Sequence, residues 1–235
     1  MKATVLLGPP GSGKGTAASS VGAGSAFCHV STGALFRDAI REENDIGLAI
    51  RPYMQSGSLV PDELVMAVVR KLLGRQSSDA CILFDGFPRT VTQAEGLDEI
   101  LRDMESQVQN VFLLEINTEA LIARLGGRLT CPACGAIFNA RSKPPRVAGR
   151  CDECGEALAQ RPDDTEETIR RRQEVYEELT LPLVAYYEAE GLIRRIDASQ
   201  SPDAVAGALL SMLNHDACSG SPGDAPGCGV PDDQN

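Results

Sequence analysis

Four cysteines stand in two pairs in the middle of the chain, and their spacing suits a metal site. Two residues separate Cys131 from Cys134 and Cys151 from Cys154, and sixteen residues separate the pairs. Two such turns can close on one Zn²⁺ through four thiolates, which leaves no open position and makes the metal structural. A disulfide pair or four free thiols are the alternatives, and disulfides are uncommon in a reducing compartment. We therefore predict one structural Zn²⁺.

A glycine-rich stretch, GPPGSGKGT from Gly8 to Thr16, follows a short apolar run. It matches the phosphate-binding pattern of Gly, four residues, Gly-Lys and Ser or Thr, except that Gly15 stands between Lys14 and Thr16. Glycines let backbone N–H groups turn toward phosphate oxygens, the next helix adds its dipole, and Lys14 supplies a point charge. A glycine-rich turn without a ligand is the alternative, but the position between a strand and a helix favours phosphate binding.

Two further stretches carry charged residues next to turns. In DGFPRT, Asp85 ends a buried apolar run, which is where ligands bind in open α/β sheets. Asp85 could hold Mg²⁺ through water, and Arg89 could clamp a phosphate with two hydrogen bonds. In STGALFR, Thr32 lies in a tight turn and Arg37 follows about one helical turn later. Read alone, each stretch could also be a turn or helix cap beside a surface arginine.

Elements that could position these residues alternate along the chain. Short apolar runs predict strands at 4–7, 81–84, 111–116 and 192–196, and helical spacing appears at 35–43, 61–73, 93–104, 118–125, 163–179 and 202–213. Alternating strands and helices predict an α/β fold with a parallel sheet flanked by helices. Residues 17–26 make a poor helix with little to pack, Asp164 and Glu167 have capping-box spacing, and Pro182 should kink or end its helix.

Composition narrows the classes of partner. The 33 acidic and 22 basic residues give a net charge of −11, which argues against duplex nucleic acid or an anionic membrane as the main partner. A local arginine cluster can still bind an anionic small ligand. The apolar run at the start of the chain is too short for the hydrophobic region of a signal peptide. No apolar stretch reaches the roughly 20 residues of a membrane span, so we expect a cytoplasmic protein. Residues 215–235 are rich in Gly, Pro, Asp and Ser and are expected to be a disordered tail.

Taken together, GPPGSGKGT, STG with Arg37, FDGFPRT with Gln93, and DDTEETIRRR resemble the adenylate kinase family over about residues 1–213. The four cysteines are similar to those of its long-lid, zinc-bearing bacterial form. The resemblance implies reversible transfer of a phosphoryl group from MgATP to AMP, giving two ADP and balancing the adenine nucleotides. It also implies a P-loop nucleoside monophosphate kinase body at 1–214, with an AMP-binding flap at 31–60 and a small zinc-ribbon lid at 127–164. A monomer is expected.

The resemblance also assigns roles to single residues. It implies that the phosphate loop and Arg128 hold the ATP phosphates, that Arg124 lies against the ATP base, and that the backbone of Gln200 contacts that base. The residues implied on the ATP side are Gly11, Ser12, Gly13, Lys14, Gly15, Thr16, Arg124, Arg128 and Gln200. On the AMP side it implies Thr32, Arg37, Leu59, Val60, Gly86, Arg89, Gln93, Arg161 and Arg172. Gln93 would read the adenine edge, and Arg37 and Arg89 would hold the AMP phosphate. The residues assigned to catalysis are Lys14, Arg89, Arg128, Arg161 and Arg172. Asp85 would hold Mg²⁺ through water, with Asp163 and Asp164 tied to lid closure.

This reaction fits the residues present, because an AMP phosphate oxygen is already ionised and needs no general base. Catalysis would then rest on positioning and charge neutralisation. The chain departs from the family at Ala34, where an acidic residue is usual, and at Leu129, where a second arginine is usual.

Other functions also fit parts of the sequence. Relatives that phosphorylate UMP or CMP have a short lid without the cysteines, so the long insert favours AMP, whereas relatives using GTP as donor keep a long lid. A nucleic-acid-binding zinc protein needs a basic or aromatic face. The insert offers one aromatic residue, Phe138, and four cations that could equally form a solvated face: Arg141, Lys143, Arg146 and Arg150. A catalytically dead nucleotide sensor is disfavoured, since so many phosphate-binding residues are kept.

Overall fold

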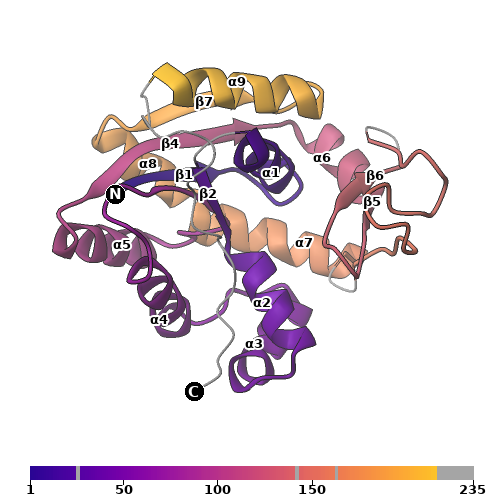
Figure 1. Cartoon of the computed structure of the whole chain (residues 1–235), viewed down its shortest axis with the longest axis horizontal. Coiled ribbons are helices and arrows are strands. Elements are labelled where there is room, and N and C mark those ends of the chain that lie inside the picture. Colours follow the sequence, from indigo (N-terminus) through magenta and orange to yellow (C-terminus); the bar gives the residue numbers. More distant parts are fainter. Residues whose placement is uncertain (25–26, 141–142, 162–163, 216–235) are drawn as a thin grey trace.

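A five-stranded parallel sheet forms the centre of the molecule (Figure 1). The computed structural model describes residues 1–24, 27–140, 143–161 and 164–215. The strand order is β2-β3-β1-β4-β7, with bounds Phe27–Ser31, Cys81–Asp85, Lys2–Leu7, Gln107–Glu115 and Ile193–Asp197. The predicted parallel α/β sheet is confirmed, and the four predicted strands correspond to β1, β3, β4 and β7. Strand β2 was not predicted, although it lies directly before the STG stretch.

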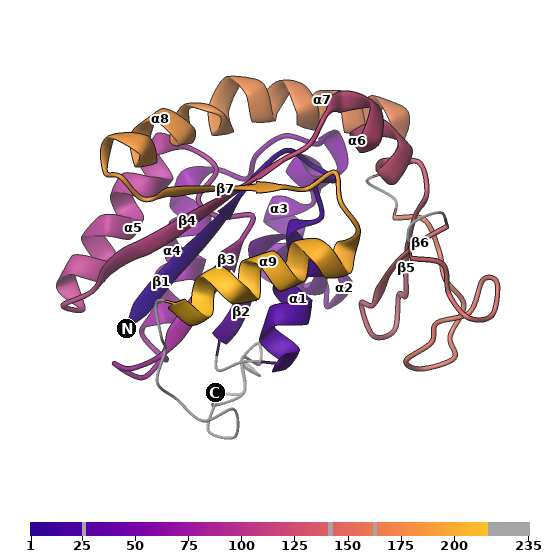
Figure 2. The same cartoon turned by 90° about the horizontal axis from the view of Figure 1, so that it is seen from above.

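Helices cover both faces of the sheet (Figure 2). Helices α1 (Lys14–Gly24) and α9 (Pro202–His215) pack on one face, where Val21, Leu83 and Leu209 belong to a single buried cluster. Helices α4 (Asp62–Leu73), α5 (Val91–Asp103) and α8 (Pro182–Ala189) pack on the other. Two apolar cores therefore hold the strands between them, as expected for a parallel sheet buried on both faces.

Helix α1 packs better than its composition suggested. Ala17, Ala18 and Val21 are at most 2% exposed and contact the same core as α9. Small side chains allow a helix to approach a sheet closely, so the expectation of little packing was wrong. The close approach fixes the helix whose first turn carries Lys14.

Two helices form the segment predicted as an AMP-binding flap. Helix α2 (Thr32–Arg41) was expected, whereas α3 (Asp45–Ser56) was not. The start of α3 is capped by Asn44, whose Oδ1 accepts a hydrogen bond from the Gly47 N–H at 2.9 Å. Gly57 ends it in the left-handed conformation that favours glycine. The pair projects from the sheet below α1 in Figure 1.

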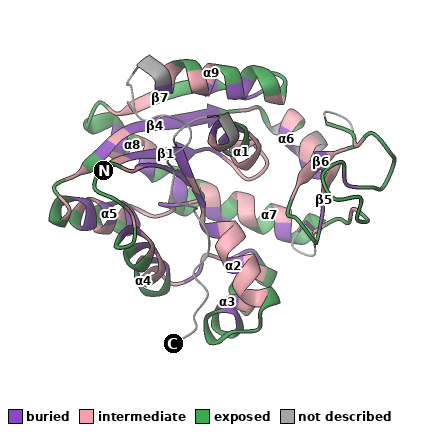
Figure 3. Cartoon of the chain, viewed as in Figure 1, coloured by how far each residue is buried: buried purple, intermediate pink, exposed green. Residues whose placement is uncertain are grey.

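The cysteine insert forms a separate small lobe after α6 (Thr118–Leu125). Strands β5 (Arg128–Thr130) and β6 (Ile137–Asn139) pair antiparallel, and Cys131, Phe138 and Cys151 make its small core. Figure 3 shows most of this lobe as exposed. A lobe with so little buried apolar surface needs a staple to hold its shape.

The chain then returns along α7 (Glu166–Val175), a π-helical turn η1 (Tyr176–Thr180) and α8. The N-cap of α7 is Thr165, whose Oγ1 accepts a hydrogen bond from the Thr168 N–H at 3.2 Å. The predicted Asp164–Glu167 capping box was therefore wrong, because the Asp164 carboxylate is bonded to an arginine instead. Pro182 is the first residue of α8, so α7 ends before it as predicted.

Helix α9 continues to His215, the first residue of the predicted tail. Residues 216–235 lie outside the described residues, as do Arg141 and Asp163. Among the helices that are described, none is long and apolar enough to cross a membrane.

Candidate active site

The carboxyl ends of the strands meet at one edge of the sheet, beside a cavity of about 1160 Å³. Ser31 ends β2 in register with Asp85 at the end of β3, and Leu6 pairs with Asp85 from the other side. The loop after β1, helices α1, α2 and α7, and the small lobe also line the cavity. Ligands bind at this edge in open α/β sheets.

The glycine-rich loop curls around the ammonium group of Lys14. Its Nζ donates hydrogen bonds to the carbonyl oxygens of Gly8 at 2.6 Å and Pro9 at 2.9 Å. Gly8 has φ +143°, and a Cβ there would lie 2.7 Å from the Leu114 carbonyl oxygen, so only glycine fits. Because α1 begins at Lys14, its free N–H groups face the same space as the lysine. Burial lowers the pKa of Lys14 to about 8, against the opposing effect of Asp85.

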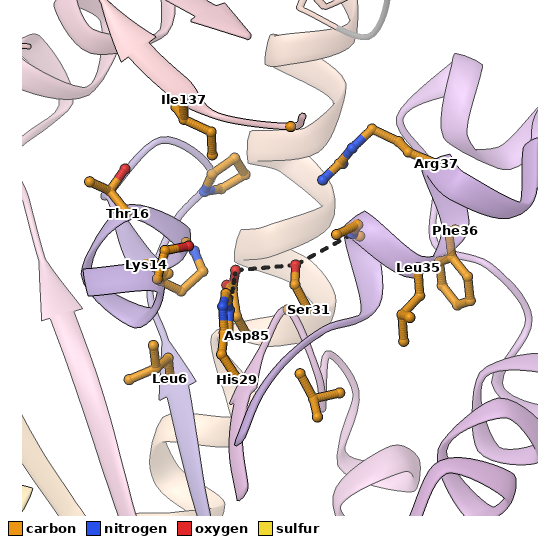
Figure 4. Close-up of a pocket in the computed structure, with 18 of the residues that line it drawn as sticks. Leu6, Lys14, Thr16, His29, Ser31, Leu35, Phe36, Arg37, Asp85 and Ile137 are labelled. Atoms are coloured by element: carbon orange, nitrogen blue, oxygen red, sulfur yellow. Dashed lines mark hydrogen bonds and ion pairs between the residues drawn. The ribbon is translucent and has the colours of Figure 1, made fainter. Parts of the chain in front are cut away.

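Asp85 is an anion beside this lysine (Figure 4). The Ser31 hydroxyl donates to its Oδ2 at 3.4 Å, and His29 Nε2 lies 3.7 Å from the same oxygen. Burial alone would raise the pKa of Asp85, but the adjacent His29 and the charges of Lys14 and Arg89 hold it below its usual value. A carboxylate that stays ionised and faces a phosphate loop suits Mg²⁺, which prefers hard oxygen ligands and keeps several waters.

Three arginines gather on the side of the cavity opposite the loop. Arg89 donates through Nε to the Gly86 carbonyl oxygen at 2.8 Å, and its own carbonyl accepts from the Thr180 hydroxyl at 2.9 Å. Burial, followed by the nearby charges of Arg172 and Arg37, lowers the pKa of Arg89 to about 10. Arg37 points toward the cavity from α2 (Figure 4). Mutually repelling guanidinium groups held together in this way suit a phosphate.

Arginines of the lobe and of α7 complete the wall. Arg128 Nε donates to Asp164 Oδ2 at 2.7 Å, and Arg172 Nη1 lies 3.5 Å from Asp164 Oδ1. Arg161 Nε donates to the Thr130 hydroxyl at 2.9 Å. Arg128, Arg161 and Arg172 all line the cavity. Asp164 thus joins Arg128, the first residue of β5, to Arg172 on helix α7.

Arg124 connects the glycine-rich loop with the loop after β7. Its Nη1 donates to the Ser12 carbonyl oxygen at 3.2 Å, and its Nη2 donates to the Gln200 carbonyl oxygen at 2.8 Å. Two residues expected near one nucleotide base therefore lie in direct contact, although they are 76 positions apart.

Most of the residues expected at the site line the cavity: Gly11, Ser12, Gly13, Lys14, Gly15, Thr16, Arg37, Leu59, Asp85, Gly86, Arg89, Arg124, Arg128, Arg161 and Arg172. Gln200 does not line the cavity, but its carbonyl oxygen bonds Arg124, which does. Thr32, Val60 and Gln93 lie behind the wall and are 2%, 5% and 2% exposed. The Thr32 hydroxyl donates to the Gly86 carbonyl oxygen at 2.9 Å, so in this structure it braces the turn rather than facing the cavity.

Sequence reasoning missed three polar residues at this site. Ser31 and His29 bond or adjoin Asp85, and Asp62 bonds Gln93. Ser31 could have been found, since it immediately precedes the turn that holds Thr32. Asp62 could not, because its first-turn position in α4 is fully explained as a favourable interaction with the helix dipole.

The four cysteine sulfurs of the lobe cluster within 4.8 Å of one another. Sγ–Sγ separations are 3.4 Å for Cys131–Cys154, 3.5 Å for Cys134–Cys151 and 3.6 Å for Cys134–Cys154. Disulfide sulfurs lie ~2.0 Å apart, whereas sulfurs bound tetrahedrally to one Zn²⁺ at ~2.3 Å lie ~3.8 Å apart. The cluster therefore fits a zinc ion.

A phosphate loop at the carboxyl edge of a parallel sheet, facing an arginine cluster across one cavity, defines a P-loop phosphotransferase. The model of the family "Adenylate kinase" matches residues 6–192. The chain is 45% identical over 212 residues to an adenylate kinase of Moorella thermoacetica and 41% identical over 212 residues to one of Clostridium botulinum, each match covering 90% of this chain and 98% of the relative. It is 43% identical over 209 residues to one of Syntrophobacter fumaroxidans, covering 89% of this chain and 98% of the relative. The chain belongs to the adenylate kinase family and is a nucleoside monophosphate kinase.

Proposed function

We propose that this enzyme transfers a phosphoryl group from MgATP to AMP and so forms two ADP. The observation that carries the proposal is one cavity with two cationic walls built from different elements. Lys14 and the loop form one wall, and Arg37, Arg89 and Arg172 form the other. The charges of Arg89 and Arg172 reach Lys14, so the two walls converge. Two anionic phosphate chains can face each other there, while a simple hydrolase needs only one such wall.

On the donor side, the ATP phosphates would lie in the loop from Gly11 to Thr16, with Lys14 as the point charge. Arg128 would reach the same phosphates from the lobe. The Arg124–Gln200 contact would form one side of the base site, since both residues lie beside the loop. Mg²⁺, held through water by Asp85, would neutralise charge on the β- and γ-phosphates.

On the acceptor side, the AMP phosphate would lie against Arg37 and Arg89, with Gly86 and Thr32 shaping the turn beneath it. Leu59 lines the cavity and would contact the nucleoside, with Val60 buried behind it. Gln93 would read the adenine edge. Arg161 and Arg172 would contact the phosphoryl group in transit. No general base is assigned, because the attacking AMP oxygen is ionised at neutral pH.

We propose the matching division of the chain: a kinase body at 1–214, an AMP-binding flap at 31–60 and a zinc lid at 127–164. Helices α2 and α3 make the flap, and β5 and β6 belong to the lid. Both carry cationic residues of the cavity wall. Movement of such elements excludes water from the reacting groups. One structural Zn²⁺ on the four cysteines would keep the lid rigid.

Reduced thiolate ligands fit a cytoplasmic enzyme, and we propose that location together with a monomeric state. A nucleic-acid-binding role is less well supported. Among the basic residues of the lid, Arg146 lies 4.0 Å from Asp152 and Arg150 donates to the Gly155 carbonyl oxygen, so these cations already have partners within the lid.

The test is a coupled assay that detects ADP, run with MgATP and each of AMP, GMP, IMP, UMP and CMP. The proposal predicts rapid turnover with AMP and rates lower by at least tenfold with the others. GTP in place of ATP measures the strictness of the donor site. Preference for UMP or CMP would overturn the assignment of the acceptor.

A further inference from the structure

Asp62 connects two helix starts behind the cavity wall. It is the first residue of α4 and does not line the cavity. Its Oδ1 accepts a hydrogen bond from Gln93 Nε2 at 2.7 Å, and its Oδ2 accepts one from the Thr90 hydroxyl at 3.0 Å. Thr90 is the N-cap of α5 and also accepts from the Gln93 N–H at 3.1 Å. Asp62 is therefore held on both oxygens while it holds the Gln93 amide.

The two partners of the Gln93 amide fix which end is oxygen and which is nitrogen. Gln93 Oε1 accepts from the Arg89 backbone N–H at 2.8 Å, and that group can only donate. An ionised Asp62 can only accept, so it must face the NH₂ end. Turning the amide by 180° would place NH₂ against N–H and oxygen against carboxylate. Both contacts would then be repulsive, and the amide is locked in one orientation.

Each end of the locked amide keeps one hydrogen-bonding position that Asp62 and Arg89 do not use, an N–H on Nε2 and a lone pair on Oε1. Gln93 is 2% exposed behind the cavity wall, so the base would reach these positions as that wall moves aside. Adenine offers a complementary edge, with a 6-amino donor beside a ring-nitrogen acceptor. A 6-oxopurine such as hypoxanthine has the opposite arrangement, with an oxygen acceptor at position 6 and a donor at N1. An amide free to turn could match either base in the same pose, whereas a locked one matches only adenine.

We propose that Asp62 is a positioning residue that makes the acceptor site select 6-aminopurine over 6-oxopurine nucleotides. It acts through Gln93 and touches no reacting atom. This inference rests on the proposed function, in which Gln93 reads the base of the acceptor. Arg89 supports the connection, because the same residue that lines the cavity holds Gln93 Oε1 through its backbone.

The experiment compares kcat/KM for AMP and for IMP at saturating MgATP. Asp62→Asn keeps the shape of the side chain but lets either a carbonyl oxygen or an NH₂ group face Gln93. The part of the lock that Asp62 supplies is then lost, and only the Arg89 N–H still favours one orientation of the amide. Glu63→Gln is the matched control, since it makes the same charge change at the exposed neighbouring position of α4. Gln93→Leu removes the reading amide itself. The AMP:IMP ratio is measured on one preparation of each variant, so a fraction of unfolded protein cancels.

We expect Asp62→Asn to lower the AMP:IMP ratio about tenfold or more, mainly through a higher KM for AMP and a maintained kcat, while Glu63→Gln keeps the wild-type ratio. Thr90→Val, which frees Asp62 on its other side, should shift the ratio in the same direction by a smaller factor. A ratio in Asp62→Asn equal to that of the wild type, with Gln93→Leu strongly altered, would overturn the role of Asp62 and leave the proposed function standing. An unaltered ratio in Gln93→Leu, or a wild-type enzyme inactive with AMP, would instead refute the proposed role of Gln93 or the function, and this inference with it.

Discussion

Asp164 accepts hydrogen bonds from both Nε and Nη2 of Arg128, and its carboxylate is fully buried. The same carboxylate lies 3.5 Å from Arg172 on α7. A fork-to-fork pair of this kind is both strong and directional. Asp164 thereby holds Arg128, at the start of the lid, next to Arg172 on α7. The position of the lid and the placement of two cavity arginines therefore both depend on the Asp164 side chain.

Replacing Asp164 with Ala should destabilise the protein by about 3 kcal/mol, because it leaves two guanidinium groups partly buried without their anion. The measurement is urea unfolding of the purified enzyme followed by circular dichroism. Glu166→Ala is the control, since Glu166 forms an exposed pair with Arg170 one turn away and should change stability by less than about 0.5 kcal/mol. An equal loss of unfolding free energy in the two variants would show that the buried pair stabilises the protein no more than the exposed one.

Lys14→Met should lower kcat by at least about 10²-fold and leave the melting temperature unchanged within about 2 °C. The substitution removes a point charge from the phosphate site, and the Gly8 and Pro9 carbonyls that it leaves lie in a loop bordering the open cavity. Arg102→Met, on the exposed last turn of α5, is the control for loss of a cation and should keep full activity. Near-normal kcat in Lys14→Met would contradict the assignment of the loop.

ATP binding should weaken as pH rises through the pKa of Lys14, which burial lowers to about 8. Below that value the free protein already carries the ammonium; above it, a proton must be taken up before the phosphates can be held. Affinity for ATP in EDTA should fall about tenfold between pH 7 and pH 9, with uptake of close to one proton at pH 9. Titration calorimetry in two buffers of different ionisation enthalpy measures both quantities.

The control for this pH dependence is Lys14→Arg, whose guanidinium stays charged across the range and should bind ATP with a flat profile. Unchanged affinity of the wild type between pH 7 and pH 9, without proton uptake, would show that Lys14 is charged throughout.

The purified protein should contain one zinc per chain under reducing conditions, and Cys151→Ser should lose most of it. Because the lid has only a small core around Phe138, the loss should melt the lid before the body and appear as an early transition in a thermal scan. Cys154→Ser should behave alike, since all four sulfurs share one cluster. Wild-type protein free of metal, with an intact lid, would contradict the structural role proposed for zinc.

Much of the fold could be predicted because it follows from local patterns. The run from Cys81 to Phe84 is apolar throughout, as a strand buried on both faces must be, and β3 lies there. Helix α3 was not predicted, because Asp45–Ser56 contains Gly47 and Pro52, which lower helix propensity, although Asn44 and Gly57 are favourable caps.

The candidate site was predictable where a motif binds phosphate with its own backbone, as in the loop around Lys14. Contacts made by tertiary structure were not predictable. Asp164 had the spacing of a capping residue, and its real partner, Arg128, is 36 positions away. Asp62 and Gln93 are 31 positions apart and meet only because α4 and α5 start side by side. The spacing of residues along the sequence does not indicate which distant residues will form such pairs.

The most direct test of the central claim is to supply AMP labelled in its phosphate together with unlabelled ATP and Mg²⁺, and to separate the products. Two phosphate sites facing each other across one cavity predict that labelled ADP appears in a one-to-one ratio with ATP consumed, that unlabelled ADP appears in equal amount, and that inorganic phosphate stays at background. Consumption of ATP with release of inorganic phosphate, while labelled AMP remains unchanged, would contradict the account.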